Sequence, residues 1–124
     1  MEPIKKCLLT DFNDEYWQNI TDKCLRTEVK RLNVKNHSLY GQMKERIKTD
    51  DILLSKASHI IANLTLLNRK IYGDVAILRN KNGKKAIRKI RLNELVDNNK
   101  ELRFELRSRR INNNIEIFTW DICF

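Results

Sequence analysis

The chain has 124 residues, of which 41% are hydrophobic and 33% are charged, and it carries a formal net charge of +9 at pH 7. This length suits one domain whose core is large enough to fold without a metal ion or a disulfide framework. No apolar stretch reaches the ~18 residues of a membrane-spanning helix, and the first residues lack the apolar run of a secretory signal. We therefore expect a single intracellular domain over residues 1–124 that does not bind a membrane.

The cysteines and histidines give no sign of a metal or catalytic site. Cys7, Cys24 and Cys123 are an odd number at spacings that match no disulfide framework and no zinc pattern, so we expect reduced thiols. The two histidines, His37 and His59, have no cysteine or carboxylate at a ligand or triad spacing, and no glycine-rich phosphate loop is present. The sequence therefore predicts a protein that is not an enzyme and that uses neither a cofactor nor a metal.

Three helices are predicted in the first half of the chain, within residues 11–68. Residues 10–32 place apolar side chains at three- and four-residue steps, with acidic residues near the start and basic residues near the end. A shorter helix is expected over residues 38–48, and a third, more apolar helix follows it. The polar face of this third helix carries Ser55, Lys56, His59 and Asn63, side chains of a kind that faces either bases or water.

Residues 74–92 are predicted to form a β-hairpin with Asn82-Gly83 as its turn. Asn-Gly is the strongest short-range signal for a two-residue hairpin loop, because both residues tolerate a positive φ. The apolar residues would lie at the base of this hairpin and the cations toward its tip. Its basic residues are Arg79, Lys81, Lys84, Lys85, Arg88, Lys89 and Arg91.

Two more strands are predicted in the last part of the chain. Residues 101–110 alternate between apolar and charged side chains, which is typical of a strand with one buried face. Residues 115–123 would form the last strand, and the asparagine-rich run between the two favours an antiparallel hairpin. The expected fold class is therefore α+β, with an N-terminal three-helix segment followed by an antiparallel sheet of about four strands in residues 71–124.

The order of three helices and a basic hairpin resembles the winged helix-turn-helix proteins. This resemblance implies that the third helix is the recognition helix and that the hairpin is a wing, with Lys81, Lys84, Lys85 and Arg88 on phosphates. The chain departs from the pattern in three ways: it has no glycine in the turn after Lys48, its third helix is too long and too apolar, and two strands follow the wing.

The positive charge is concentrated in one part of the chain. Residues 69–110 contain 14 Lys and Arg against 5 Asp and Glu, which accounts for the whole net charge of +9. A localised basic field is typical of polyanion binding, and the alternative is a solvated surface on a basic protein. We expect the basic segment to bind phosphates of DNA or RNA largely without sequence specificity.

Residues 115–124 support a different function. They are apolar with few charges, and an edge strand at this place would allow another protein chain to pair with it. In that reading Phe118 and Trp120 contact the partner, and the protein is a non-enzymatic structural or assembly component. The alternative is that these residues complete the core of the domain.

The amino-acid composition is biased toward isoleucine, asparagine and lysine. The chain contains 14 Ile, 14 Asn and 14 Lys, and it opens with Met-Glu-Pro-Ile. Such a bias follows AT-rich codons, and in this respect the chain resembles small proteins of large AT-rich DNA viruses, poxviruses above all. The resemblance implies a viral protein of the cytoplasm or the virion, although AT-rich bacteria and their phages share the same bias.

Overall fold

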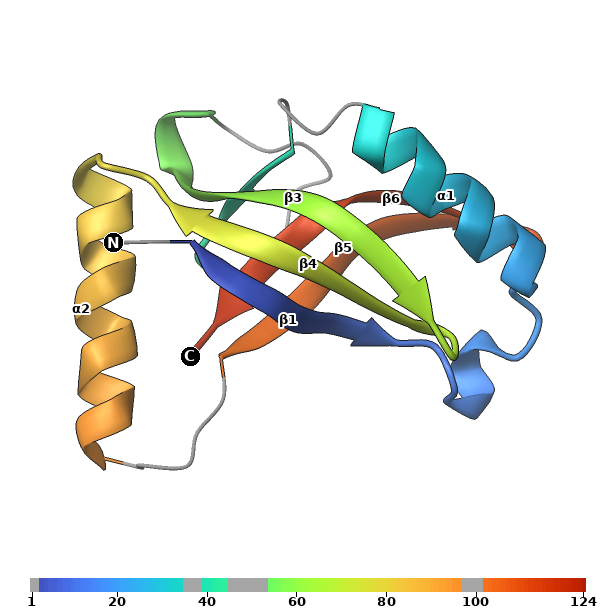
Figure 1. Cartoon of the computed structure of the whole chain (residues 1–124), viewed down its shortest axis with the longest axis horizontal. Coiled ribbons are helices and arrows are strands. Elements are labelled where there is room, and N and C mark those ends of the chain that lie inside the picture. The colour runs from blue at the N-terminus through green and yellow to red at the C-terminus, as the bar shows by residue number, and fades with distance from the viewer. Residues whose placement is uncertain (1–2, 35–38, 45–53, 97–101) are drawn as a thin grey trace.

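The computed structural model describes residues 3–34, 39–44, 54–96 and 102–124 (Figure 1). Within these ranges the chain forms six strands and two α-helices, and short 3-10 turns at Glu15–Trp17 (η1) and Leu54–Lys56 (η3) join some of them. In chain order the main elements are β1 (Ile4–Asp11), α1 (Asp22–Val34), β2 (Tyr40–Gln42), β3 (Ala57–Leu67), β4 (Lys70–Ile77), α2 (Lys81–Val96), β5 (Arg103–Ile111) and β6 (Asn114–Cys123).

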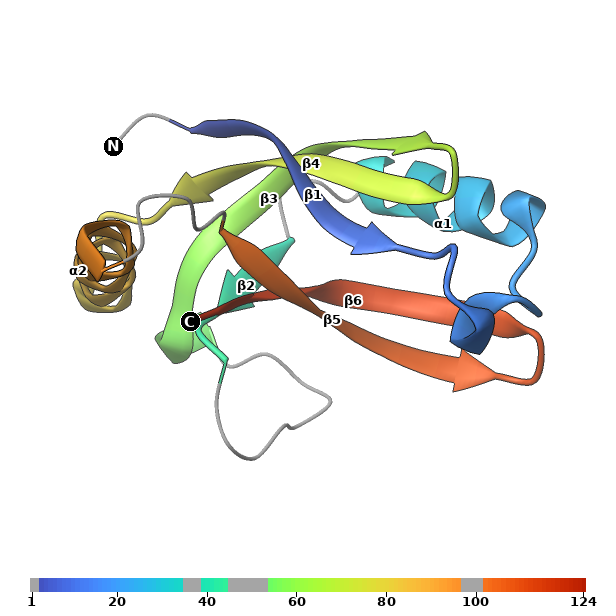
Figure 2. The same cartoon turned by 90° about the horizontal axis from the view of Figure 1, so that it is seen from below.

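The strands form two antiparallel sheets around one core. The larger sheet has the order β1-β4-β3-β2, and β5 pairs only with β6 (Figure 2). The two sheets meet where Met43 bridges to Ile122 and the Lys44 N–H donates to the Ile122 carbonyl at 2.9 Å. The strands therefore follow one another around the core as an incomplete barrel, in the order β1-β4-β3-β2-β6-β5.

The core lies between the two sheets and includes two large aromatic side chains, one that directly follows β1 and one from β6. Phe12 and Trp120 have no exposed surface, and aliphatic side chains such as Ile61, Ile71 and Ile117 pack with them. The indole N–H of Trp120 donates to the Thr10 hydroxyl at 2.6 Å. This bond satisfies the one polar group that burial of a tryptophan brings into the core.

α1 closes the side of the barrel where β2 is too short to do so. The Asn33 side chain donates to the Leu64 carbonyl at 2.9 Å and accepts from the Leu64 N–H at 2.8 Å. Glu28 accepts from the Ile117 N–H at 2.8 Å, while Arg31 donates to the Ile117 carbonyl at 2.7 Å. Side chains of one helix thus take the place of a neighbouring strand for both β3 and β6.

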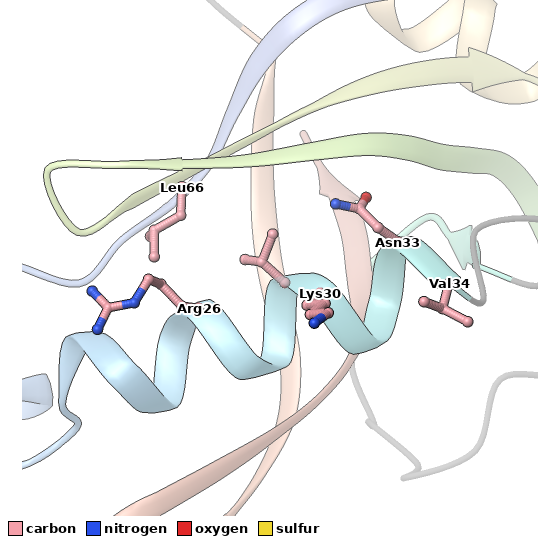
Figure 3. Close-up of a pocket in the computed structure, with 6 residues that line it drawn as sticks. Arg26, Lys30, Asn33, Val34 and Leu66 are labelled. Atoms are coloured by element: carbon pink, nitrogen blue, oxygen red, sulfur yellow. The ribbon is translucent and has the colours of Figure 1, made fainter.

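Figure 3 shows the space between α1 and β3 on the solvent side of these bonds, where Asn33 and Leu66 lie above the exposed Arg26 and Lys30. We predict that Asn33→Ala lowers the free energy of unfolding by about 2 kcal/mol, because a partly buried N–H and carbonyl lose their partners. Arg26→Ala, in the same pocket, is expected to change it by less than about 0.5 kcal/mol. Urea denaturation measures both, and equal effects would contradict the role of Asn33.

The prediction of an N-terminal three-helix segment is wrong. Residues 4–11 form β1, and the long apolar run at residues 57–67 forms β3 instead of a third helix. β3 has a register shift between Ala62 and Thr65, and Asn63 lies there at φ 54°. Such a bulge breaks the two-residue alternation of a strand, so the buried positions imitate the spacing of a helix. Residues 45–53, which contain the end of the expected second helix and the start of the expected third, lie outside the described residues.

The prediction of a basic hairpin over residues 74–92 is also wrong. β4 ends at Ile77 and α2 begins at Lys81, with Asn80 as its cap: the Asn80 side chain accepts from the Gly83 N–H at 2.7 Å. Asparagine is as strong a signal for a helix start as for a turn. A Cβ on Gly83 would lie 1.8 Å from the Leu78 carbonyl oxygen, so this glycine serves close packing. Without a wing, the winged helix-turn-helix resemblance does not hold.

The observed tight hairpin joins β3 to β4 through Asn68 and Arg69. Both have positive φ, at 50° and 61°, as a two-residue loop requires. The Arg69 guanidinium fixes this loop by donating to the carbonyls of Phe12 and Trp17 and pairing with Asp22. The second predicted hairpin is confirmed, because β5 and β6 pair as antiparallel neighbours.

Candidate functional site

The basic residues that the sequence analysis selected lie on one helix. In α2 the buried positions are Gly83, Ala86 and Ile90, at three- and four-residue steps, and they face β3 and β4. At 100° per residue the exposed cations gather on the opposite side. The exposed basic residues of α2 are Lys81, Lys84, Lys85, Arg88, Lys89 and Arg91.

Those six residues define the cationic face of α2. None of the six forms an ion pair with another described residue, and the sequence has no acidic residue between Asp74 and Glu94. The Lys89 ammonium lies 5.4 Å from the centre of the Phe124 ring, which is a cation–π contact and leaves its charge in place. α2 stands at one end of the molecule in both views (Figures 1 and 2), so a long ligand can reach it.

The structure brings two of the other predicted nucleic-acid contacts to α2. Arg79 is exposed just before the helix, and the exposed Lys56 lies at its first turn, where the Asn82 side chain donates to the Ser55 carbonyl at 2.7 Å. Asn63 is elsewhere, in the middle of β3, where its side chain donates to Asp74 at 2.9 Å. The candidate site therefore consists of α2 and the residues next to its N-terminus, Arg79 and Lys56, and it does not include the expected recognition helix.

The structure gives the C-terminal strand a different place from the one expected of a docking edge. Trp120 has no exposed surface, while Phe118 is partly buried. The edge of β6 that faces away from β5 is covered: Glu28 and Arg31 bond to Ile117, His59 to the Trp120 carbonyl and Lys44 to the Ile122 carbonyl. These backbone groups are therefore occupied within the described structure, and Trp120 is part of the core, whereas a role of the partly buried Phe118 in binding a partner stays a prediction.

A cluster of polar side chains is buried between the two sheets. The His59 Nε2–H donates to the Trp120 carbonyl at 2.8 Å, which leaves Nδ1 to accept from the Ser58 hydroxyl at 2.9 Å. Burial lowers the pKa of His59, so the ring is neutral near pH 7. A Cβ on Gly41 would lie 2.1 Å from His59 Nε2, so only glycine leaves room for this ring.

The same region holds a buried ion pair between neighbouring strands. Arg107 donates to Asp121 through Nε at 2.9 Å and Nη2 at 2.8 Å, and their side chains are 4% and 1% exposed. The alternation of residues 101–110 predicted Arg107 on the exposed face, together with the other charged residues. The sequence did contain one signal of this buried ion pair, which is an aspartate within the apolar strand β6.

In the part of the chain that the structure describes, no three His, Cys, Asp or Glu side chains are placed to hold a metal ion.

The comparisons with known proteins bear on the fold. No protein-family model matches the sequence, and no curated protein is significantly similar to it. Among solved structures, the capsid assembly protease of bacteriophage T4 matches with a TM-score of 0.67 over 100% of this chain and 91% of that chain, at 14% identity. The chain has the fold of that protease. A fold supports many functions, so the function has to be argued from the residues.

Within the part of the chain that the structure describes, neither α1 nor α2 is long and apolar enough to cross a membrane.

We predict that the free energy of unfolding decreases as the pH is lowered, because His59 titrates. Its pKa is lowered in the folded protein, so below about pH 6.5 the unfolded chain binds a proton that the folded chain does not. The free energy of unfolding should therefore be constant from about pH 8 to 7 and fall below pH 6.5 by at most about 1.4 kcal/mol per pH unit. Urea denaturation at several pH values measures this slope. His59→Gln should remove it and His37→Gln should keep it, whereas the opposite result would assign the slope to His37.

Proposed function

We propose that this chain is a viral assembly protein that acts by binding and not by catalysis. One observation carries the proposal: the whole chain adopts the fold of a phage capsid assembly protease. Among the described contacts, the hydrogen bond between Ser58 and His59 joins a hydroxyl to an imidazole, as the nucleophile and the general base of a serine protease are joined. Neither residue has any exposed surface, so a substrate peptide cannot reach the Ser58 hydroxyl.

Two measurements test this proposal. A tagged chain recovered from its native source should enrich capsid-forming or scaffold proteins over an untagged control, and recovery of none would overturn the assembly role. A fluorophosphonate probe should label the wild-type chain no more than Ser58→Ala. Labelling that Ser58→Ala removes would show a reactive serine and overturn the non-catalytic part.

A second function, nucleic-acid binding, is favoured by the cationic face of α2. Its six cations have no ion-pair partner among the described residues, and Arg79 and Lys56 extend the charge beyond the helix. Lys and Arg side chains on one helix face suit a phosphate backbone, and nothing in this face provides the base-reading pattern of a specific site. Capsids enclose nucleic acid, so this activity is compatible with an assembly role. Affinity for DNA or RNA that does not fall steeply with salt would contradict it.

A further inference from the structure

A shallow pocket of about 410 Å³ lies between α1 and β3 (Figure 3). Its size is within the range of about 300–1,000 Å³ that ligand pockets commonly have. One residue of β3 lines it, and the other lining residues follow one another on α1 at three- and four-residue steps, so they form one flank of that helix. The lining residues are Arg26, Val29, Lys30, Asn33, Val34 and Leu66.

Three of these side chains are apolar, and two of the three are incompletely covered. Val29 is buried, but Leu66 is only partly buried and Val34 is 74% exposed. The Leu66 side chain points from β3 toward α1, next to the space that Figure 3 shows. An aliphatic side chain of a partner that enters this space removes apolar surface of Val34 and Leu66 from water, which is favourable.

Two cations stand beside these apolar side chains. Arg26 and Lys30 are exposed, and neither forms an ion pair with a described residue. The two acidic residues of α1, Asp22 and Glu28, each pair with another arginine. The residues that line the pocket include no acidic one, so its charge is complementary to carboxylates.

The backbone of Leu66 is oriented toward the same side. The β3–β4 hairpin has a two-residue loop, so Leu67 and Lys70 are the hydrogen-bonded pair that closes it. Because such pairs alternate along an antiparallel ladder, the N–H and carbonyl of Leu66 point away from β4. They point to the side on which Leu64 bonds to Asn33, and no described residue bonds to them. A peptide group of a ligand can therefore bond to Leu66.

We propose that this pocket binds an acidic peptide segment of a partner protein that carries a bulky aliphatic side chain. The aliphatic side chain covers Val34 and Leu66, and a peptide group of the segment bonds to the Leu66 backbone. Carboxylates on either side of it pair with Arg26 and Lys30. The two cations and the backbone groups favour a peptide over a free fatty acid, which has one carboxylate and no peptide group. This inference rests on the proposed assembly function and gives the chemistry of the partner.

Selection of a random peptide library on the wild-type chain tests the pocket. Enriched peptides should combine Asp or Glu with a large aliphatic residue, and their titration should shift amide resonances of α1 and Leu66. Arg26→Gln combined with Lys30→Gln should weaken binding about five- to tenfold, since two exposed ion pairs are lost. Val34→Ser should weaken it about fivefold, since an apolar contact is lost.

The matched control makes the same change of charge on α2, as Lys84→Gln combined with Arg88→Gln, and should bind the selected peptides like the wild type. The inference is overturned if no peptide is enriched, if the α1 and α2 variants bind equally, or if the shifted resonances lie elsewhere. Decanoate is the probe for a free fatty acid, and decanoate that binds this pocket while no peptide is enriched would identify a different occupant.

Recovery of capsid-forming proteins separates failure of this inference from failure of the assembly role. If the wild type and the variant with Arg26→Gln and Lys30→Gln recover them equally, the contact lies elsewhere on the chain and the assembly role stands. If the wild type recovers none, the assembly role itself fails.

Discussion

Replacement of Lys84, Lys85 and Arg88 by Gln is expected to lower the affinity of the chain for nucleic acid by about 10²- to 10³-fold near 0.1 M salt. Each lost phosphate contact removes about 0.9 from the slope of log K against log salt, so the slope should decrease by about 2.7. The loss should be similar for duplexes of different sequence, because contacts to phosphates carry no base information. Fluorescence anisotropy with a labelled duplex across a salt series measures both quantities.

The control for this prediction lies on the other helix. Lys23, Arg26 and Lys30 are exposed on α1, and their replacement by Gln changes the net charge by the same amount with the same residue types. If the effect came from net charge alone, both variants would lose affinity equally, and that outcome would contradict an interface on α2. Neither set should alter the far-ultraviolet circular dichroism, because Lys, Arg and Gln have similar helix propensities.

Asp121→Ala is expected to lower the free energy of unfolding by about 3–5 kcal/mol. The substitution removes the carboxylate that pairs with the Arg107 guanidinium, at a position where only 4% of the arginine side chain reaches solvent. It also removes the carboxylate oxygen that lies 3.4 Å from the Gln42 N–H. For a domain with a total stability of about 5–15 kcal/mol, this loss is large enough to lower the melting temperature clearly.

A double variant separates the unpaired charge from the loss of packing. Arg107→Met combined with Asp121→Leu removes both charges and keeps most of the volume, so it should recover most of the lost stability. Urea denaturation of the wild type, the single variant and the double variant gives the three free energies. If the double variant is as unstable as Asp121→Ala, the ion pair is not the cause.

The sequence predicted the β5–β6 hairpin and the core part of α1, because each has a local signal. Alternation over residues 101–110 and an apolar stripe around Leu25, Val29 and Leu32 are visible without knowledge of distant partners. β1 and β3 lacked such a signal, because bulges in each strand disturb the alternation. The partner of β1 is β4, far along the chain, so long-range pairing decided that segment, whereas β3 pairs with β4 through a tight turn that the sequence analysis did not identify.

The candidate site was predictable in composition and unpredictable in shape. Counting charges selected the basic residues of 79–91, since charge needs no structure to be seen. The choice between a hairpin and a helix depended on whether Asn82-Gly83 made a turn or Asn80 made a cap, and both readings satisfy local rules. The Arg107–Asp121 pair required the register of β5 against β6, which the sequence does not give.

The position of α2 gives the molecule a polarity. α2 and the first residues of β1 and β5 lie at one end, while the β3–β4 turn, the start of α1 and the β5–β6 turn lie at the other (Figure 1). If the cationic face of α2 binds nucleic acid, the segments at the other end face away from that ligand. Those segments would then stay accessible while the nucleic acid is bound.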